Sequence, residues 1–399
     1  MNAHPLDHIV VVGGGLAAAR CCEQLRRHGH AGKITMLSAE RHEPYDRPPL
    51  SKDILLGTRD HTSLGVDFAE LRVDVQLGVT ATGLGVADRV VTTSAGELPY
   101  DGVAIATGAS AIRLPGDGRQ FTVRTVDDAL RLRGRLNPGT RVVVIGASWI
   151  GAEVATAALA RGCHVTCVGA GPAPLAHALG VEVGERLVPW WDGVDLRLNT
   201  RAEAVADDGV LLAGGEWVGA DVVVTGIGVR PETSWLTSSG LTLDQGIVVD
   251  EWLRAAPGVV AVGDVAAWWS RRWQRRMRIE HWDDAASGPA VAAAALLQPC
   301  LGDVDVHDPV PYFWSDQFGH RLQYTGAHGP LDTMIWRERE GGKWTAAWVD
   351  SAGRLTGALV ADLPREMAQA RIAITRGTIA DPDMIADASV PLSKVDQSA

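Results

Sequence analysis

The feature that most constrains the fold of this chain is a glycine-rich loop between an apolar run and a helical stretch. The apolar run His8–Val12 leads into Gly13-Gly14-Gly15, a helical stretch extends from Leu16 to about His28, and a second apolar run follows at Lys33–Leu37. This order of strand, loop, helix and strand is half of a dinucleotide-binding fold. Small residues let a pyrophosphate approach the loop, where the N–H groups of the helix N-terminus point toward it.

The same order returns about 130 residues later. The apolar run Arg141–Ile145 leads into a loop from Gly146 to Gly151, a helix follows to about Arg161, and a second strand covers His164–Val168. Two such copies are an internal repeat of the mononucleotide-binding half-fold. The sequence therefore predicts an α/β protein with two Rossmann-like dinucleotide-binding domains.

The first loop reads Gly13-x-Gly15-x-x-Ala18, and Glu40 follows its second strand. A carboxylate at that position would accept hydrogen bonds from a ribose diol. A plain structural turn is the alternative, which the strand–helix–strand context disfavours. Pyrophosphate and adenosine sites together suit FAD rather than FMN. The residues predicted to bind it here are Gly13, Gly15, Leu16, Ala17, Ala18 and Glu40.

The second loop reads Gly146-x-Ser148-x-x-Gly151, with serine replacing the middle glycine. We predict that it binds a nicotinamide dinucleotide. No carboxylate for a 2′-hydroxyl and no arginine for a 2′-phosphate stands in the segment Gly169–Pro174, so the choice between NADH and NADPH stays open. Our hypothesis is a modest preference for NADH, because a 2′-phosphate carries a charge of about −2 and normally requires an arginine. The residues predicted at this loop are Gly146, Ser148, Trp149, Ile150 and Gly151.

Three shorter motifs follow further apolar runs. They are Ala106-Thr107-Gly108, Gly226-Ile227-Gly228 and Gly263-Asp264. Each alone also fits a simple turn, but their order and intervals together are hard to obtain by chance. An acid at a strand end, as at Asp264, could hold a ribityl hydroxyl of a flavin.

The tail has a different pattern, typical of antiparallel strands closed by a helix. We predict the helix at Pro364–Arg376 and a loose, polar segment over the last ~20 residues. The predicted strands are Trp314–Tyr324, Thr333–Arg337, Lys343–Val349 and Arg354–Leu359. The predicted domains are an FAD domain split into residues 1–113 and 244–310, an NAD(P) domain at 114–243, and a C-terminal α+β interface domain at 311–399.

Composition excludes several classes of protein. The net charge of −11 disfavours general nucleic-acid binding. No apolar stretch reaches the roughly 18–20 residues of a membrane span, and no signal pattern precedes the first strand, so we expect a cytoplasmic protein. The five cysteines imply no disulfide framework, and none lies between Cys22 and Cys163. Cys163 and Cys167 are expected to be core residues, and no metal site is predicted.

The order of these motifs resembles the two-dinucleotide flavoprotein reductases. Several segments are similar to the ferredoxin reductases of the putidaredoxin reductase kind, and together they cover about residues 8 to 365. The segments are Glu43-Pro44-Tyr45-Asp46-Arg47-Pro48-Pro49-Leu50-Ser51-Lys52, Gly151-Ala152-Glu153, Gly228-Val229-Arg230-Pro231, Glu280-His281-Trp282 and Pro311-Tyr312-Phe313-Trp314-Ser315-Asp316-Gln317. The resemblance implies an FAD enzyme that passes electrons from NAD(P)H to an iron–sulfur ferredoxin. That ferredoxin would serve a haem-thiolate monooxygenase or an aromatic dioxygenase, and the enzyme would be a monomer or a weak homodimer.

The resemblance also implies roles for single residues. Lys52 would lie near the reactive edge of the flavin and pair with Glu153, where a cation stabilises the reduced, anionic flavin. Trp149 would shield the flavin until nicotinamide displaces it, although simple packing is equally compatible with its position. Trp314 would lie on the nicotinamide side, and Lys52, Glu153 and Trp314 are the predicted catalytic residues. Further cofactor contacts are predicted at Arg47, Val79, Arg124, Glu280, His281 and Trp282.

A basic stretch stands out in this acidic chain. Ser270–Arg278 holds five arginines and no acid, and it lies between two segments expected to contact the flavin. We predict that Arg271, Arg272, Arg275 and Arg276 dock an acidic ferredoxin; a solvated loop is the alternative. Three other functions would share the cofactor motifs: an NAD(P)H oxidase, a rubredoxin reductase, and a signalling flavoprotein of the apoptosis-inducing-factor kind.

Overall fold

The computed structural model describes residues 6–298 and 305–396, which form two compact units. The first unit combines the chain up to Asp46 with Ser63–Ser110 and Arg230–Pro311. The second combines Arg47–Thr62 with Ala111–Val229 and the chain from Tyr312 onward. Two of the points where the chain passes from one unit to the other lie within short strands, β8 (Ala109–Ala111) and β17 (Val229–Pro231). The division into four segments predicted from the sequence stays a prediction. One of the five cysteines, Cys300, lies outside the described residues.

The first unit is built on a six-stranded sheet. Its order is β19 (Arg254–Ala256), β20 (Val259–Ala261), β7 (Gly102–Ile105), β1 (His8–Val12), β2 (Lys33–Ser38) and β3 (Val73–Leu77). All neighbouring strands are parallel except the pair β19–β20. The central strand β1 is buried on both faces, which is why it is an unbroken apolar run. Helices α1 (Leu16–Arg27) and α7 (Trp282–Leu297) pack against each other in this unit.

Two small sheets complete the first unit. The first is an antiparallel sheet of β4 (Ala81–Gly85), β5 (Val90–Thr93) and β6 (Gly96–Pro99). The second is formed by β18 (Ile247–Val248), β21 (Ala266–Ser270) and β22 (Arg275–Met277). Single-turn helices η3 (Ser234–Leu236) and η4 (Gly263–Val265) also belong to this unit.

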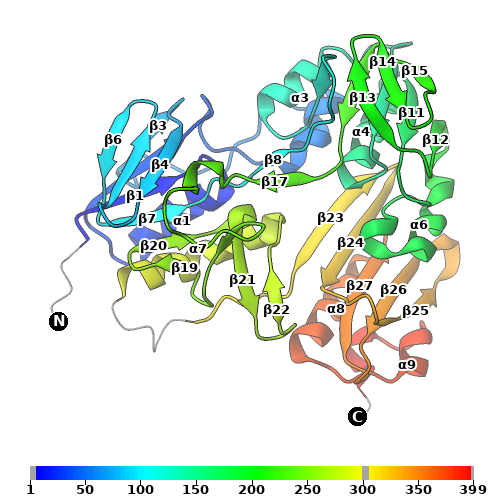
Figure 1. Ribbon diagram of the computed structural model, residues 1–399. Helices are drawn as coiled ribbons and strands as arrows, with labels where there is room; N and C mark the ends of the chain where they lie inside the picture. Colours follow the sequence, from blue (N-terminus) through cyan, green and yellow to red (C-terminus); the bar gives the residue numbers. More distant parts are fainter. Residues whose placement is uncertain (1–5, 299–304, 397–399) are drawn as a thin grey trace. The chain divides into compact units, whose positions relative to one another are not determined.

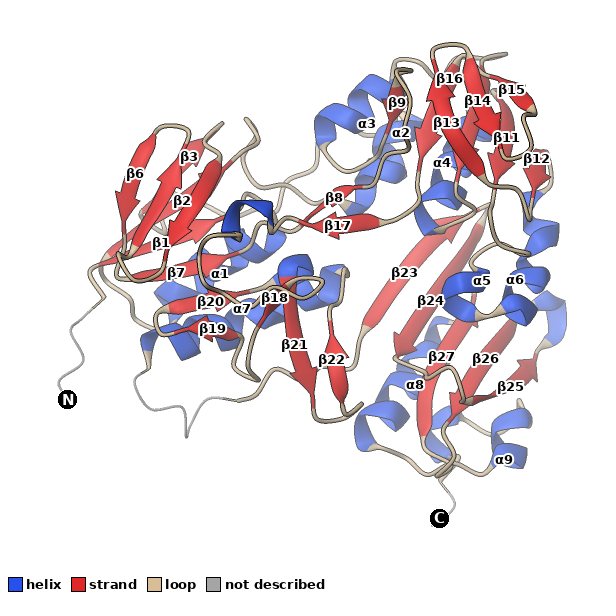
Figure 2. Cartoon of the chain, viewed as in Figure 1, coloured by secondary structure: helices blue, strands red, loops and turns tan. Residues whose placement is uncertain are grey.

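The second unit contains the predicted second copy of the half-fold. Its parallel sheet has the order β12 (Val194–Arg197), β11 (His164–Val168), β10 (Arg141–Ile145), β16 (Val222–Thr225) and β9 (Gln120–Phe121). Counted along the half-fold, the first four follow the order 3-2-1-4 of a Rossmann sheet. Helix α4 (Trp149–Ala160) packs on β10 and β11 (Figure 2).

Shorter elements surround this sheet. The strands are β13 (Ala202–Ala206), β14 (Gly209–Leu212) and β15 (Trp217–Gly219), and the helices are η1 (Pro48–Ser51), α2 (Asp53–Leu56), α3 (Val126–Arg133), α5 (Ala176–Leu179), α6 (Val181–Leu187) and η2 (Val188–Trp191). The half-fold strands that the sequence predicts in both units are confirmed to within a residue.

The tail forms a five-stranded antiparallel sheet. Its order is β23 (Tyr312–Gln317), β24 (His320–Gly326), β27 (Leu355–Ala361), β26 (Trp344–Val349) and β25 (Thr333–Glu338), with a single turn η5 at Glu340–Gly342. The predicted single strand Trp314–Tyr324 is wrong, because Phe318 and Gly319 have φ values of 51° and 80° and turn the chain into a hairpin. The predicted helix is confirmed as α8 (Pro364–Arg376), which packs on β24 and β27 (Figure 1).

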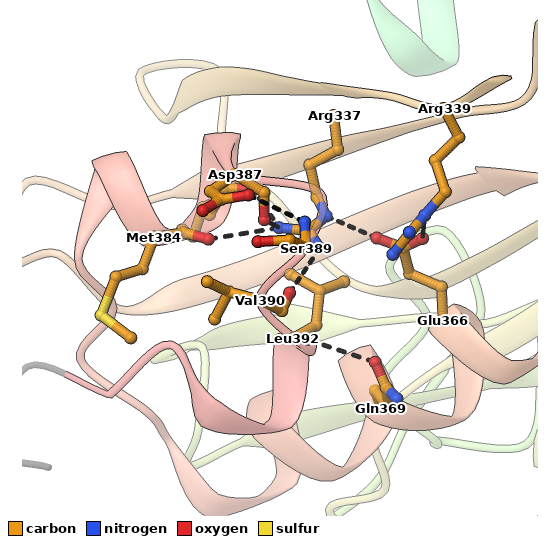
Figure 3. A network of polar contacts seen from close by, with 10 residues as sticks. Arg337, Arg339, Glu366, Gln369, Met384, Asp387, Ser389, Val390 and Leu392 are labelled. Atoms are coloured by element: carbon orange, nitrogen blue, oxygen red, sulfur yellow. Dashed lines mark hydrogen bonds and ion pairs between the residues drawn. The ribbon is translucent and has the colours of Figure 1, made fainter.

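The chain end is held by a buried arginine, which contradicts the predicted loose tail. After α8 come α9 (Pro382–Ala386) and η6 (Leu392–Lys394). Arg337 of β25 is fully buried, pairs with Glu366 of α8, and donates to four carbonyls of the tail (Figure 3). The tail is polar in composition, but its backbone satisfies the donors of this side chain, so it is ordered through Asp396.

Candidate dinucleotide-binding and electron-transfer sites

The Gly13 loop of the first unit is shaped by contact with a second predicted motif. Gly13 has a φ of +139°, and a Cβ there would lie 2.1 Å from the carbonyl oxygen of Ala106. Only glycine fits this position, and the fit brings Ala106-Thr107-Gly108 beside the loop. Helix α1 begins directly after Gly15, which has no side chain to cap the helix, so the N–H groups of the first turn remain available at the loop. This is the geometry that accepts a pyrophosphate.

Polar groups gather where β2 ends, near Glu40. The Tyr45 hydroxyl donates to the Glu40 carboxylate at 2.5 Å and orients it. The backbone N–H of Val79 donates to the carbonyl of Ser38 at 2.8 Å. The Ser38 hydroxyl is buried and has no hydrogen-bond partner among the described residues. A buried hydroxyl close to the carboxylate that is predicted to bind a ribose suits the predicted adenosine end of an FAD site, since a ligand can satisfy the hydroxyl.

The third motif of the first unit lies against the same loop. A Cβ on Gly263 would be 3.1 Å from the Cβ of Ala17, so Gly263-Asp264 packs on the start of α1. His281 precedes α7, and burial lowers the pKa of its imidazole to about 4, against the opposing effect of Asp264. The ring is therefore neutral at neutral pH. Trp282 donates from Nε1 to the Asp46 carboxylate at 2.7 Å and is partly exposed.

In the second unit, Ser148 replaces the middle glycine and has a structural task. Its hydroxyl accepts from the N–H of Gly151 at 3.1 Å, which caps α4, and donates to the carbonyl of Gly226 at 2.7 Å. A Cβ on Gly146 would lie 2.3 Å from that same carbonyl oxygen. The loop and the Gly226-Ile227-Gly228 motif are thus brought together. Ile150 and Ile227 are both exposed there, which leaves an accessible apolar edge.

The predicted pair of Lys52 and Glu153 forms inside the second unit. The Lys52 ammonium lies 2.8 Å from the Glu153 carboxylate, which is buried on α4. Two hydroxyls also donate to this carboxylate: Ser315 at 2.6 Å, and Ser51. Neither serine was predicted from the sequence to have a role. The available signal was that each directly follows or precedes a predicted site residue, Trp314 or Lys52.

The predicted aromatic residues of the second unit separate into two groups. Trp149 contacts Phe313 edge to face, with ring centroids 4.7 Å apart. Trp314 stacks on Tyr312 at 6.1 Å, and it is directed away from Phe313 and Ser315 because side chains alternate along β23. The Arg321 guanidinium also lies 6.0 Å from the centre of the Trp314 ring. Two other predicted cofactor residues, Arg47 and Arg124, are in contact with each other. The Arg47 guanidinium donates a hydrogen bond to the backbone carbonyl of Arg124 at 2.6 Å.

The basic stretch is a hairpin rather than a free loop. Strands β21 and β22 pair Trp269 with Arg276 and Ser270 with Arg275. Arg271 donates to the Glu251 carboxylate at 2.6 Å, and the Arg272 guanidinium lies 5.6 Å from the centre of the Trp273 ring. Trp269 is 43% exposed beside these arginines. The hairpin therefore presents a defined basic and aromatic surface.

The cysteines in the described residues are not poised for thiol chemistry. All four are buried, and burial raises the pKa of the Cys21 and Cys167 thiols to about 12. Thiolates are the reactive form, so these side chains are inert core residues. Of the helices formed by residues 6–298 and 305–396, none combines the length and apolarity that a membrane crossing requires.

Two loops that accept dinucleotides, one in each unit, together with a buried cation–carboxylate pair, define a nicotinamide-dependent flavoprotein oxidoreductase. The sequence model of the pyridine nucleotide-disulphide oxidoreductase family matches residues 7–288, and that of the reductase C-terminal family matches residues 312–395. The chain belongs to the pyridine nucleotide-disulphide oxidoreductase family, whose cofactors are FAD and a nicotinamide dinucleotide. The predicted fold and family resemblance are confirmed.

Relatives match over nearly their whole length. The ferredoxin–NAD(+) reductase component of the anthranilate 1,2-dioxygenase system of Burkholderia cepacia is 36% identical, over 97% of this chain and 98% of the relative. The corresponding component of the p-cumate 2,3-dioxygenase system of Pseudomonas putida is 31% identical over the same shares.

Solved structures agree with this assignment. The crystal structure of Fdr9 has 58% sequence identity and a TM-score of 0.94, and the match covers 97% of this chain and 99% of that chain. The reductase in the covalent putidaredoxin reductase–putidaredoxin complex has 29% identity and a TM-score of 0.92, with 98% of each chain covered.

Proposed function

We propose that this protein is an NAD(P)H-dependent ferredoxin reductase that supplies electrons to an oxygenase in the cytoplasm. The observation that carries the proposal is the match to oxygenase-system reductases over 97% of the chain. The buried, inert cysteines support it, because they leave no dithiol to receive electrons from a flavin. FAD, when bound, supplies the chemistry that links a two-electron hydride donor to a one-electron acceptor.

The two units divide the binding tasks in this proposal. Loop Gly13–Gly15 and helix α1 hold the FAD pyrophosphate, Glu40 with Ser38 holds its adenosine ribose, and Asp264 holds a ribityl hydroxyl. The Gly146 loop and the Gly226-Ile227-Gly228 motif bind the nicotinamide dinucleotide. Minor cofactor contacts stay as predicted at Arg47, Val79, Arg124, Glu280, His281 and Trp282.

The Lys52–Glu153 pair is proposed to tune the flavin rather than to transfer protons. Glu153 holds the Lys52 ammonium at a fixed place, and the hydroxyls of Ser51 and Ser315 hold Glu153. A cation fixed in this way stabilises negative charge that develops on a reduced cofactor. Trp149 is proposed to cover the nicotinamide site, and Trp314 to contact the nicotinamide from the other face of β23.

The test of the proposed function is cytochrome c reduction with NADH or NADPH, with and without candidate ferredoxins. We expect little reduction without a ferredoxin and fast reduction with one. Rapid oxygen consumption that no ferredoxin changes would instead identify an NAD(P)H oxidase. Electron transfer to rubredoxin alone would identify a rubredoxin reductase. A long-lived, slowly reoxidised complex with nicotinamide, inert toward every iron–sulfur acceptor, would favour a signalling flavoprotein.

Glu40→Ala should weaken FAD retention without unfolding the protein. The carboxylate lies at the end of β2, where its loss removes a ribose contact but no apolar packing. A charge-assisted hydrogen bond is worth about 1.5–3 kcal/mol, so FAD affinity should fall roughly ten- to hundredfold. FAD fluorescence during dilution measures this loss, with Glu43→Ala, an exposed carboxylate nearby in sequence, as the control. Release of FMN from the wild-type protein, or equal retention by both variants, would refute the assignment.

The β21–β22 hairpin is proposed as the ferredoxin-docking surface. Ferredoxins are generally acidic, and a basic surface steers such a partner despite the net charge of −11. Changing Arg271, Arg272, Arg275 and Arg276 to Gln should raise the KM for ferredoxin and weaken its salt dependence, with the KM for nicotinamide unchanged. Such steering is screened over ~8 Å at physiological salt, so ferredoxin reduction by the wild type should slow markedly at high salt.

A charge-matched variant separates docking from overall electrostatics. Changing four other exposed arginines, Arg119, Arg135, Arg365 and Arg376, to Gln alters the net charge equally. This control should keep the wild-type KM for ferredoxin. If both quadruple variants behave like the wild type, the hairpin is not the docking surface.

A further inference from the structure

The end of β11 lacks the group that usually binds the adenosine ribose of a nicotinamide dinucleotide. In a Rossmann fold a carboxylate at this strand end accepts from the 2′-hydroxyl. Here the position is Gly169, which is buried, and no charged side chain follows before Leu175. A Cβ on Gly169 would lie 3.1 Å from the Cβ of Ala147 and 3.3 Å from Leu198 Cδ2. A carboxylate side chain would therefore crowd both the dinucleotide loop and the neighbouring strand.

The turn that follows the neighbouring strand β12 lies against the end of β11, where the carboxylate is missing. The backbone N–H of Asn199 donates to the Gly171 carbonyl at 2.9 Å, and that of Thr200 donates to the Gly169 carbonyl at 2.9 Å. These two bonds fix the turn after β12 beside the end of β11. Asn199 is exposed, and within residues 6–298 and 305–396 its carboxamide has no hydrogen-bond partner. Its φ of 51° is a left-handed conformation that asparagine tolerates better than most residues.

The charges around this turn do not favour a 2′-phosphate. Arg197, the last residue of β12, donates to Asp195 at 2.9 Å and to Glu216 at 2.8 Å. Two carboxylates thus engage the nearest strand-end cation, which leaves that cation little attraction for a phosphate. Arg201 is exposed, and it is the remaining cation close in sequence.

We propose that Asn199 binds the 2′-hydroxyl of the adenosine ribose, replacing the missing carboxylate at the end of β11. This proposal rests on the proposed nicotinamide site at the Gly146 loop. A carboxamide can donate to and accept from a hydroxyl, but it carries no charge to repel a 2′-phosphate. Discrimination between NADH and NADPH is consequently weak, with NADH favoured by less than about tenfold, because the phosphate meets neither attraction nor strong repulsion.

The test uses ligand binding rather than turnover. ADP-ribose and 2′-phospho-ADP-ribose are titrated into the FAD-loaded protein by calorimetry, so the flavin chemistry does not enter the readout. Asn199→Gly removes the carboxamide without straining the left-handed backbone and should weaken ADP-ribose binding about three- to tenfold, the value of one neutral hydrogen bond. Asn199→Asp should raise the preference for ADP-ribose over its 2′-phosphate at least about tenfold, because the new carboxylate repels the phosphate.

Asn137 provides the matched control. It is exposed and precedes β10, so it lies at the amino-terminal ends of the parallel strands, whereas Asn199 follows the carboxyl end of β12. Asn137→Gly and Asn137→Asp should leave both affinities unchanged. If the Asn199 variants also bind both ligands like the wild type, or if a 2′-phosphate preference is present and vanishes in Arg201→Gln, the inference is overturned. If the wild-type protein binds neither ligand, the proposed nicotinamide site at the Gly146 loop is itself contradicted.

Discussion

Replacing Arg337 with alanine is expected to lower the free energy of unfolding of the second unit by about 3–5 kcal/mol. The guanidinium is fully buried and pairs with Glu366, which is itself 4% exposed. Removing the cation leaves a buried carboxylate without its main partner. It also orphans the tail carbonyls of Met384, Ile385, Asp387 and Val390, which the guanidinium donors satisfy (Figure 3).

The measurement is denaturant unfolding followed by tryptophan fluorescence, since Trp344 and Trp348 lie on the adjacent strand β26. Arg339→Ala is the control, because Arg339 also donates to Glu366, at 3.1 Å, but is exposed. We expect Arg339→Ala to lower the free energy of unfolding by less than about 1 kcal/mol. Limited proteolysis should cut residues 381–396 faster in Arg337→Ala alone. Equal, small losses in both variants would mean that the tail does not depend on Arg337.

Local pattern was enough to predict the two half-folds. Parallel strands such as β1 and β10 are buried on both faces, so each is an unbroken apolar run with a glycine at its end. Gly13 and Gly146 are required because backbone carbonyls approach them closely. The apolar run and the glycine that follows it both lie within about thirty residues, the size of one strand–helix–strand unit, so a local pattern reveals them.

What the sequence did not predict depends on contacts between distant segments. The tail was expected to be loose because its own composition is polar, but the donors that order it belong to Arg337, about fifty residues earlier. The hydroxyls of Ser51 and Ser315 lie 102 and 162 residues from Glu153 in the chain. A serine has no local pattern that reveals such a partner. The turn at Phe318 was missed for a different reason, since a non-glycine residue adopts its positive φ.

Replacing Glu153 with leucine is expected to separate the stability of the second unit from its redox function. The carboxylate is 4% exposed, and its loss leaves the Lys52 ammonium with one other partner in the described part of the chain, the carbonyl of Pro48 at 3.4 Å. Removing one member of a buried ion pair lowers the free energy of unfolding by about 3 kcal/mol or more. Lys52→Met should lower the free energy of unfolding by a similar amount, because the buried Glu153 carboxylate then lacks its cation.

The double variant Lys52→Met/Glu153→Leu decides what the pair is for. Replacing both members of a buried ion pair with apolar side chains is often neutral, so the double variant should regain most of the stability that either single change loses. If the pair fixes a cation for the reduced cofactor, flavin reduction by NADH, followed by stopped-flow absorbance, should stay slow in the double variant. Asp221→Asn, which breaks the exposed Arg141–Asp221 pair of the same unit, should change neither quantity appreciably. A double variant that recovers both stability and the wild-type rate would show that Lys52 and Glu153 serve folding alone.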